Sequence, residues 1–172
     1  MELKALLDSK DIKPKEKTET ISQLLIDKKL STDELIKTAL SSKDSPKATC
    51  IEALEFATLK HPEIATKACL DFVSATLTEK APRVKWESAK VIGNIAHLYA
   101  DHLDTAVKNL LVNTEHEGTV VRWSAAFALG QIVKTKHPKT KVLIPALEAI
   151  CTREEKNSIK KIYTDALKKC KA

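Results

Sequence analysis

The chain has 172 residues, enough for one ordinary domain, and 43% of them are hydrophobic although only 4% are aromatic. Its formal net charge of +6 allows an acidic partner but falls short of the dense basic clusters of a dedicated nucleic-acid binder. No stretch approaches the roughly 18 apolar residues of a membrane span, and the first residues lack the apolar core of a secretory signal. We therefore expect a cytoplasmic protein with no membrane partner.

The composition favours helices throughout. Glycine is scarce (three residues), and Ala, Leu, Ile, Lys and Glu dominate. No run of alternating apolar and polar residues is bounded by turn signals, so we predict an all-α fold without a sheet. The four cysteines, Cys50, Cys69, Cys151 and Cys170, are widely separated among apolar helical neighbours. We expect small buried thiols and not a disulfide framework.

Start and stop signals divide the chain into helices joined by connections of about two to six residues. Ser31 and Glu34 form a capping box, because a hydroxyl and a carboxylate three residues apart can satisfy free backbone amides. Ser45 and Pro46 read as the cap and first turn of a later helix. Pro145 should kink its helix or delay the start. The predicted helices cover residues 2–9, 14–28, 31–40, 46–60, 62–77, 82–99, 102–113, 119–135, 138–152 and 156–170.

One helical stretch occurs twice, 37 residues apart. Residues 84–95 and 121–132 align valine with valine, a basic residue with a basic residue, Trp86 with Trp123, and glycine with glycine. A fixed period of this length, carried by helical patterning, indicates stacked helix pairs. We predict a single repeat domain over 1–172, with an N-terminal capping pair followed by four repeat units. The capping pair covers 1–30, and the units cover 31–60, 62–99, 102–135 and 138–170.

The second helix of each unit resembles the inner helix of a HEAT repeat. Residues 121–132 begin with Val-Arg and continue with small residues and Leu-Gly, as that pattern does. Glu79 stands six places before Lys85, where the family has an acidic residue, whereas the matching place before Arg122 holds His116. The resemblance implies a right-handed armadillo/HEAT-like α-solenoid whose second helices line a concave face. It also implies a scaffold for protein–protein interaction, which is the family's chief role.

Trp86 and Trp123 occupy the same position of the repeat, here called a column. The last unit has Lys160 in this column, so packing does not require a large apolar side chain there. A spacing of four residues places successive side chains on one face of each second helix. We expect this concave patch to hold a peptide, a helix or a protein surface. An alternative stays open, in which both indoles pack onto adjacent helices. The patch comprises Trp86, Lys90, Asn94, Trp123, Phe127 and Gln131.

A basic stripe is the second candidate site, since residues 87–172 carry 14 basic and 9 acidic groups. These side chains could instead pair with turn carboxylates or form a solvated face. The stripe keeps nucleic-acid binding open as an alternative function. In this respect the chain resembles the small basic HEAT-like DNA glycosylases, which act on alkylated bases. Those enzymes place a carboxylate beside concave aromatics, and here Glu87 is the only obvious one. The stripe comprises Lys85, Arg122, Lys156, Lys160, Lys161 and Lys168.

Motifs for catalysis or metal binding are missing from the sequence. There is no Gly-rich phosphate loop, serine nucleophile motif or Cys–His pair. His97 and His102 straddle a helix end, which is a poor spacing for metal ligands. We therefore expect no enzymatic activity, no cofactor and no metal. The expected partner is a protein or peptide, and the expected oligomeric state is a monomer or a weak homo-oligomer.

Overall fold

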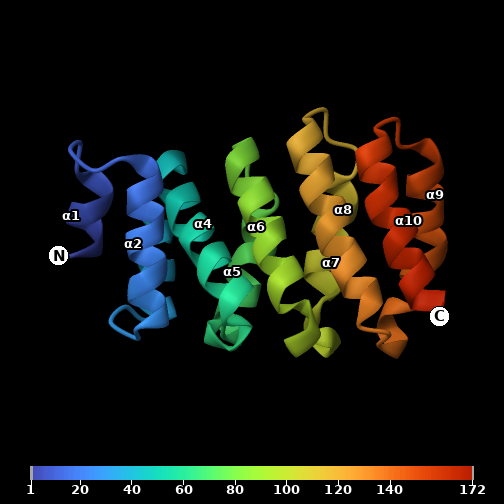
Figure 1. Ribbon diagram of the computed structural model, residues 1–172, viewed down its shortest axis with the longest axis horizontal. Coiled ribbons are helices and arrows are strands. Elements are labelled where there is room, and N and C mark those ends of the chain that lie inside the picture. The colour runs from blue at the N-terminus through green and yellow to red at the C-terminus, as the bar shows by residue number, and fades with distance from the viewer. Residues whose placement is uncertain (1, 172) are drawn as a thin grey trace.

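The computed structural model describes residues 2–171, and the regular structure within that range is entirely helical (Figure 1). It contains ten α-helices and no strand, which confirms the all-α prediction. The α-helices are α1 (Leu3–Asp8), α2 (Pro14–Ile26), α3 (Thr32–Leu40), α4 (Asp44–Lys60), α5 (Lys67–Thr76), α6 (Pro82–Ile95), α7 (Asp104–Asn113), α8 (Thr119–Lys134), α9 (Leu143–Arg153) and α10 (Asn157–Lys171). Short 3-10 helices occupy η1 (Pro62–Ile64), η2 (Ala96–Leu98), η3 (Ala100–His102) and η4 (Pro138–Thr140).

Most helix starts follow the sequence signals. The Ser31 hydroxyl accepts a hydrogen bond from the Glu34 amide at 3.1 Å and caps α3. Pro145 lies in the first turn of α9, whose start is delayed to Leu143, as expected. The start of α4 was predicted wrongly: α4 begins at Asp44, so Ser45 is inside its first turn and not its cap. Proline is tolerated there because amides of the first turn lack an intrahelical partner.

The predicted helices 62–77 and 82–99 are shortened because 3-10 turns replace one end of each. The segment 62–77 opens as the 3-10 helix η1 and becomes α-helical only at Lys67, where the Thr66 hydroxyl accepts from the Cys69 amide at 3.3 Å. The segment 82–99 leaves α-helical geometry after Ile95 and continues as η2. Local 3-10 turns at helix ends are common because they satisfy orphan backbone groups without extending the helix.

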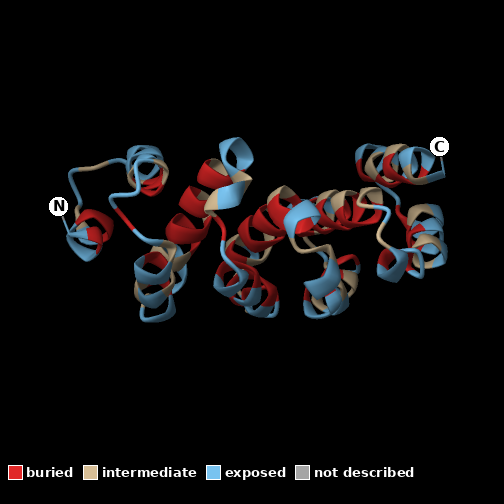
Figure 2. Cartoon of the chain, turned by 90° about the horizontal axis from the view of Figure 1, so that it is seen from below, coloured by how far each residue is buried: buried red, intermediate tan, exposed pale blue. Residues whose placement is uncertain are grey.

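The helices form two layers. The even-numbered helices stand side by side along the molecule, and the odd-numbered ones lie behind them (Figure 1). Figure 2 shows the even layer along the inner side of a shallow arc, with the buried faces of the helices turned toward the space between the layers. Leu54, Ile92 and Leu129 are fully buried there and belong to one continuous core. Because no helix pair buries its apolar face alone, each unit depends on its neighbours for stability.

Ion pairs tie repeat units together. Lys47, in the first turn of α4, contacts Glu79 in the turn before α6 at 3.0 Å. Arg122 in α8 contacts Glu154 in the turn before α10 at 3.2 Å. The acidic turn residue of the repeat pattern therefore pairs with the basic residue of the preceding unit. This contact links one unit to the next and explains why both residue types recur with the period.

All four cysteines are free thiols. Cys50 and Cys69 are buried, as expected, but Cys151 and Cys170 are only partly buried. Burial raises the pKa of the Cys50 thiol to about 12, which makes it chemically inert at neutral pH. Among the described residues, no helix is long and apolar enough to cross a membrane.

Candidate functional site

An aromatic stack stands on the concave face of α8. Trp123 and Phe127 are one helical turn apart, with ring centroids separated by 5.8 Å and ring planes 8° apart. Trp123 is 39% exposed and Phe127 is half-buried. The Phe127 ring also lies against Gly93 of α6, where a Cβ atom would overlap it. We call Trp123 and Phe127 the aromatic shelf, since together they cover the junction between α6 and α8 with rigid apolar surface.

Trp86 is held more firmly than Trp123. It is half-buried, and its indole N–H donates to the carboxylate of Glu87 at 2.9 Å. The two tryptophans thus occupy the same repeat column with different exposure. One indole is exposed and the other is partly packed, which is a mixture of the two alternatives.

Beside Trp86 lie two buried carboxylates, Glu55 of α4 and Glu87 of α6, here called the acid pair. They are 6% and 4% exposed. The Lys90 ammonium stands 3.9 Å from Glu55 and 3.8 Å from Glu87, so it approaches both without a close hydrogen bond. The Oε2 atom of Glu87 has no hydrogen-bond partner among the described residues. Burial, only partly opposed by Lys90, raises the pKa of Glu87 to about 7.

Sequence analysis named Glu87 as the one obvious carboxylate beside the concave aromatics, but it did not place Glu55 next to it. The next unit has the buried Ser124 in the column of Glu87, and Gly93 follows Glu55 by 38 residues. A carboxylate at a repeat position that holds a small residue in the next unit was the available signal. It also bears on catalysis: Glu87 is buried behind Trp86 and Lys90, so its carboxylate is not presented to a bulky nucleobase in the way the glycosylase resemblance implied.

A hollow of about 520 Å³ lies on the concave face between α2 and α4, and Glu55 is the member of the acid pair that lines it. Its apolar lining comes from Ile26, Phe56 and Leu59, and Leu59 is 66% exposed. Its polar lining carries two carboxylates and two ammonium groups beside a hydroxyl and an amide, from Glu19, Glu55, Lys60, Lys90, Ser22 and Gln23. We call it the α2–α4 hollow. It extends the concave surface toward the N-terminus, beyond the patch that the sequence predicted.

Two polar residues of the predicted patch differ in availability. Asn94 was expected to hydrogen-bond a partner, but its amide group donates to the Glu55 carbonyl at 3.1 Å and the Thr58 hydroxyl at 3.2 Å. Asn94 therefore joins α6 to α4 through its NH2 group, and those donors are not free for a partner. Gln131 is half-buried, and its side-chain amide makes no hydrogen bond within the described residues, so this amide is available.

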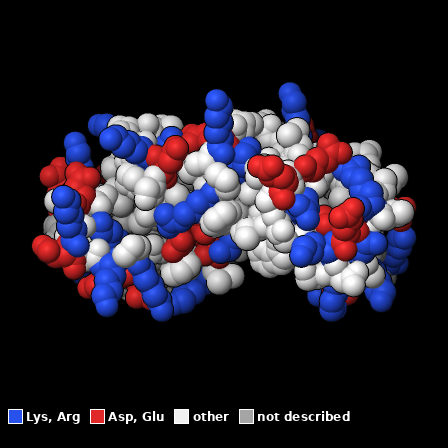
Figure 3. Space-filling view, turned by 90° about the horizontal axis from the view of Figure 1, so that it is seen from above, with Lys and Arg blue, Asp and Glu red and all other residues white. Residues whose placement is uncertain are grey.

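The predicted basic stripe is interrupted by contacts inside the fold. Lys85 donates to the Leu77 carbonyl at 3.1 Å, and burial lowers its pKa. Arg122 is engaged by Glu154 and by two backbone carbonyls. Of the remaining lysines in the stripe, Lys156, just before α10, is exposed, as are Lys161 and Lys168 in α10, and Lys160 is partly buried. Figure 3 shows basic and acidic side chains intermixed on the face it views, without a continuous basic band.

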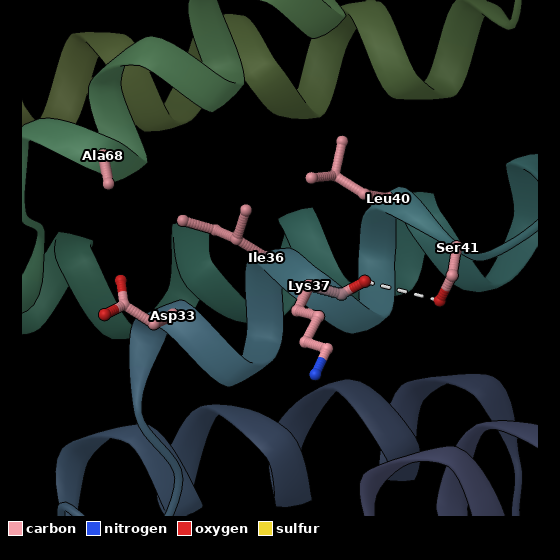
Figure 4. Close-up of a pocket in the computed structure, with 6 residues that line it drawn as sticks. All are labelled: Asp33, Ile36, Lys37, Leu40, Ser41 and Ala68. Carbon is pink, nitrogen blue, oxygen red and sulfur yellow. Dashed lines mark hydrogen bonds between the residues drawn. The ribbon is translucent and has the colours of Figure 1, made fainter.

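The odd-numbered layer has a hollow of its own between α3 and α5. Ile36 and Leu40 point into it toward Ala68, whereas Lys37 points away (Figure 4). Leu40 is 64% exposed. This hollow is apolar and lacks an unsatisfied polar group, so it offers less chemistry for recognition than the concave face does.

Comparison with known proteins places the fold. No protein-family model matches the chain, and no curated protein matches it in sequence. A designed armadillo repeat protein in complex with the peptide (KR)4 superposes with a TM-score of 0.73 over 98% of this chain and 80% of that one, at 18% identity. Computationally designed armadillo repeat proteins for modular peptide recognition give 0.71 over 97% and 80%, at 16%. An engineered protein gives 0.73 over 99% and 47%, at 18%. The fold is an armadillo/HEAT-like α-solenoid.

Proposed function

We propose that this protein is a non-catalytic binding scaffold that holds a peptide or an extended protein segment on its concave face. The observation that carries the proposal is the aromatic shelf, in which Trp123 is 39% exposed and stacked on Phe127. Exposed aromatic clusters rimmed by polar groups tend to mark contact sites. Two of the designed proteins of similar fold are described as peptide binders, which supports the proposal by analogy of fold alone.

The shelf suits recognition because it is already ordered. Gly93 lies against the Phe127 ring, and stacking on Phe127 holds the Trp123 ring in place before any partner arrives. Binding then loses little side-chain entropy, and burial of the exposed ring contributes directly to affinity. Gln131, one turn beyond Phe127, offers an amide that can pair with a peptide backbone.

Peptide display with the purified protein tests this function. A random peptide library is selected on the wild type, and each enriched peptide is measured by fluorescence anisotropy on the wild type and on Trp123→Ala. We expect the substitution to weaken binding about tenfold or more, because a central aromatic contact is lost. The matched control is Val142→Ala, which removes a 77% exposed apolar side chain from the odd-numbered layer and should leave binding unchanged.

Melting curves show whether each variant remains folded. Enriched peptides that bind Trp123→Ala as tightly as the wild type would refute the concave site. Failure to enrich any peptide, together with salt-sensitive binding of a DNA duplex, would move the function to nucleic-acid binding.

A further inference from the structure

A group of lysines continues the concave face beyond the aromatic shelf. Lys134 follows Phe127 by two helical turns, so both side chains lie on the same face of α8. Lys168 of α10 occupies the repeat position that Gln131 has in α8, and Lys169 is its neighbour. Within the described chain, none of these three ammonium groups makes an ion pair or a hydrogen bond. We call Lys134, Lys168 and Lys169 the lysine cluster.

Asp165 is the carboxylate beside the lysine cluster, and it is already engaged. The Lys161 ammonium donates to it at 2.7 Å. This hydrogen bond, and then the charges of Lys161 and of two cluster lysines, lower the pKa of Asp165. Partial burial, and then the Lys169 charge, lower the pKa of Lys134. Lys134 and Lys169 therefore repel each other, and Asp165 is shared among three ammonium groups.

The remaining residues of α8 and α10 do not balance this charge. The two helices together carry seven Lys or Arg side chains and one Asp. In contrast, α2 and α4, at the other end of the same layer, carry four basic and five acidic side chains. The helix dipole favours lysine in the last turn of a single helix, but it does not account for the scarcity of acids along both helices. The concave layer is therefore basic beside the aromatic shelf and not along its whole length.

We propose that the partner presents an acidic segment, whose Asp or Glu carboxylates pair with the lysine cluster while an apolar side chain covers the aromatic shelf. The inference rests on the proposed function and names the chemistry of its partner. A carboxylate between the lysines relieves their repulsion and accepts charge-assisted hydrogen bonds, which are stronger than neutral ones. The charge of this segment is opposite to that of (KR)4, the peptide in complex with a designed protein of similar fold.

The spacing of shelf and cluster suits an extended peptide. Seven residues separate Phe127 from Lys134 along α8, which corresponds to a rise of about 10 Å. An extended peptide covers about 10 Å in three residues. A partner with an apolar residue and a Glu three places apart therefore reaches both sites with one straight segment.

The experiment uses the intact protein and three fluorescein-labelled octapeptides, (EF)4, (QF)4 and (KF)4. Their alternation places the variable residue three positions from a phenylalanine, and the side chain at that residue sets the charge. Fluorescence anisotropy gives the dissociation constants. We expect (EF)4 to bind about tenfold more tightly than (QF)4, and (KF)4 to bind least. Added salt should narrow the difference between (EF)4 and (QF)4.

Two substitutions in the lysine cluster test where the carboxylates bind. The double variant Lys134→Gln, Lys168→Gln should weaken (EF)4 about tenfold and leave (QF)4 unchanged, because only carboxylates lose a partner. The matched control combines Lys108→Gln with Lys141→Gln, which removes the same number of charges from an exposed lysine of α7 and one just before α9. We expect the control to bind (EF)4 like the wild type. Melting curves check that both double variants are folded.

Several outcomes would overturn the acidic partner. They are no binding of (EF)4 up to about 1 mM, equal binding of (EF)4 and (QF)4, and equal weakening of (EF)4 by the control variant. Tighter binding of octathymidylate than of (EF)4 through the same lysines would also overturn it, in favour of a single-stranded nucleic acid.

Failure of the scaffold function looks different. Trp123→Ala should weaken (EF)4 and (QF)4 alike, because both peptides use the aromatic shelf. If it does so while the lysine variant has no effect, the scaffold stands and the acidic partner falls. If the lysine variant weakens (EF)4 and Trp123→Ala does not, the acidic partner stands and the aromatic site falls.

Discussion

The Phe127 ring of α8 lies against Gly93 of α6, in space that any side chain at position 93 would fill. Gly93 thus allows the ring to lie flat across the helix junction, and the ring in turn supports Trp123. The glycine is required by a close approach between helices, because its backbone is ordinary helix. Exposure of the aromatic shelf therefore depends on a residue that lies outside it.

Gly93→Ala should disturb the shelf while the protein stays folded. The added methyl group pushes the Phe127 ring outward, whereas the helix gains up to about 1 kcal/mol in propensity, which offsets part of the clash. In a Trp86→Phe background, Trp123 fluorescence should become more accessible to acrylamide. Gly130→Ala is the matched control, because its methyl group would meet Ala166 and not an aromatic ring. An unchanged Trp123 signal in Gly93→Ala would contradict the supporting role of Phe127.

The two tryptophans should differ in fluorescence. Trp123 is exposed and stacked, whereas Trp86 is half-buried and donates to Glu87 at 2.9 Å. Trp86→Phe, which leaves Trp123 alone, should show red-shifted emission that acrylamide quenches readily. Trp123→Phe should show bluer, better protected emission. If acrylamide quenched Trp86 more readily than Trp123, the exposed indole would be Trp86, and the aromatic shelf would be assigned to the wrong repeat unit.

The repeat made much of this architecture predictable. Alignment of Trp86 with Trp123 at 37 residues located the second helices, and Lys160 in the same column indicated that the column faces solvent. Such reasoning uses only the periodicity along one helix. It correctly brought Trp123 and Phe127 together, since residues four apart share a helix face.

Contacts between helices were less predictable. Asn94 lies at the same repeat position as Gln131, yet its NH2 group is engaged because α4 offers the Glu55 carbonyl and the Thr58 hydroxyl at that point. Only the three-dimensional stack brings these groups within reach. The same holds for Glu87, whose burial beside Glu55 depends on how α4 and α6 pack. Differences between repeats, and not the shared pattern, produce the site.

The ion pair between units should contribute strongly to stability. Glu154 is 7% exposed and accepts from Arg122 at 3.2 Å. Arg122→Ala would leave a buried carboxylate without its cation and should lower the free energy of unfolding by about 2–4 kcal/mol, measured by urea denaturation. Lys161→Ala is the control, since it breaks an exposed pair with Asp165 and should cost less than about 1 kcal/mol. Equal losses in the two variants would show that burial adds nothing to the pair.

Glu87 should make stability depend on pH. Burial raises its pKa from 4.5 to about 7, so the folded state holds the proton more tightly than the unfolded state does. Its contribution to stability is fully present below about pH 4.5 and is lost as the pH rises to about 7. Glu87→Gln should therefore be more stable than the wild type at pH 8, by roughly 2 kcal/mol, and lose this advantage near pH 5. Urea denaturation across this range tests it, and parallel profiles would contradict it.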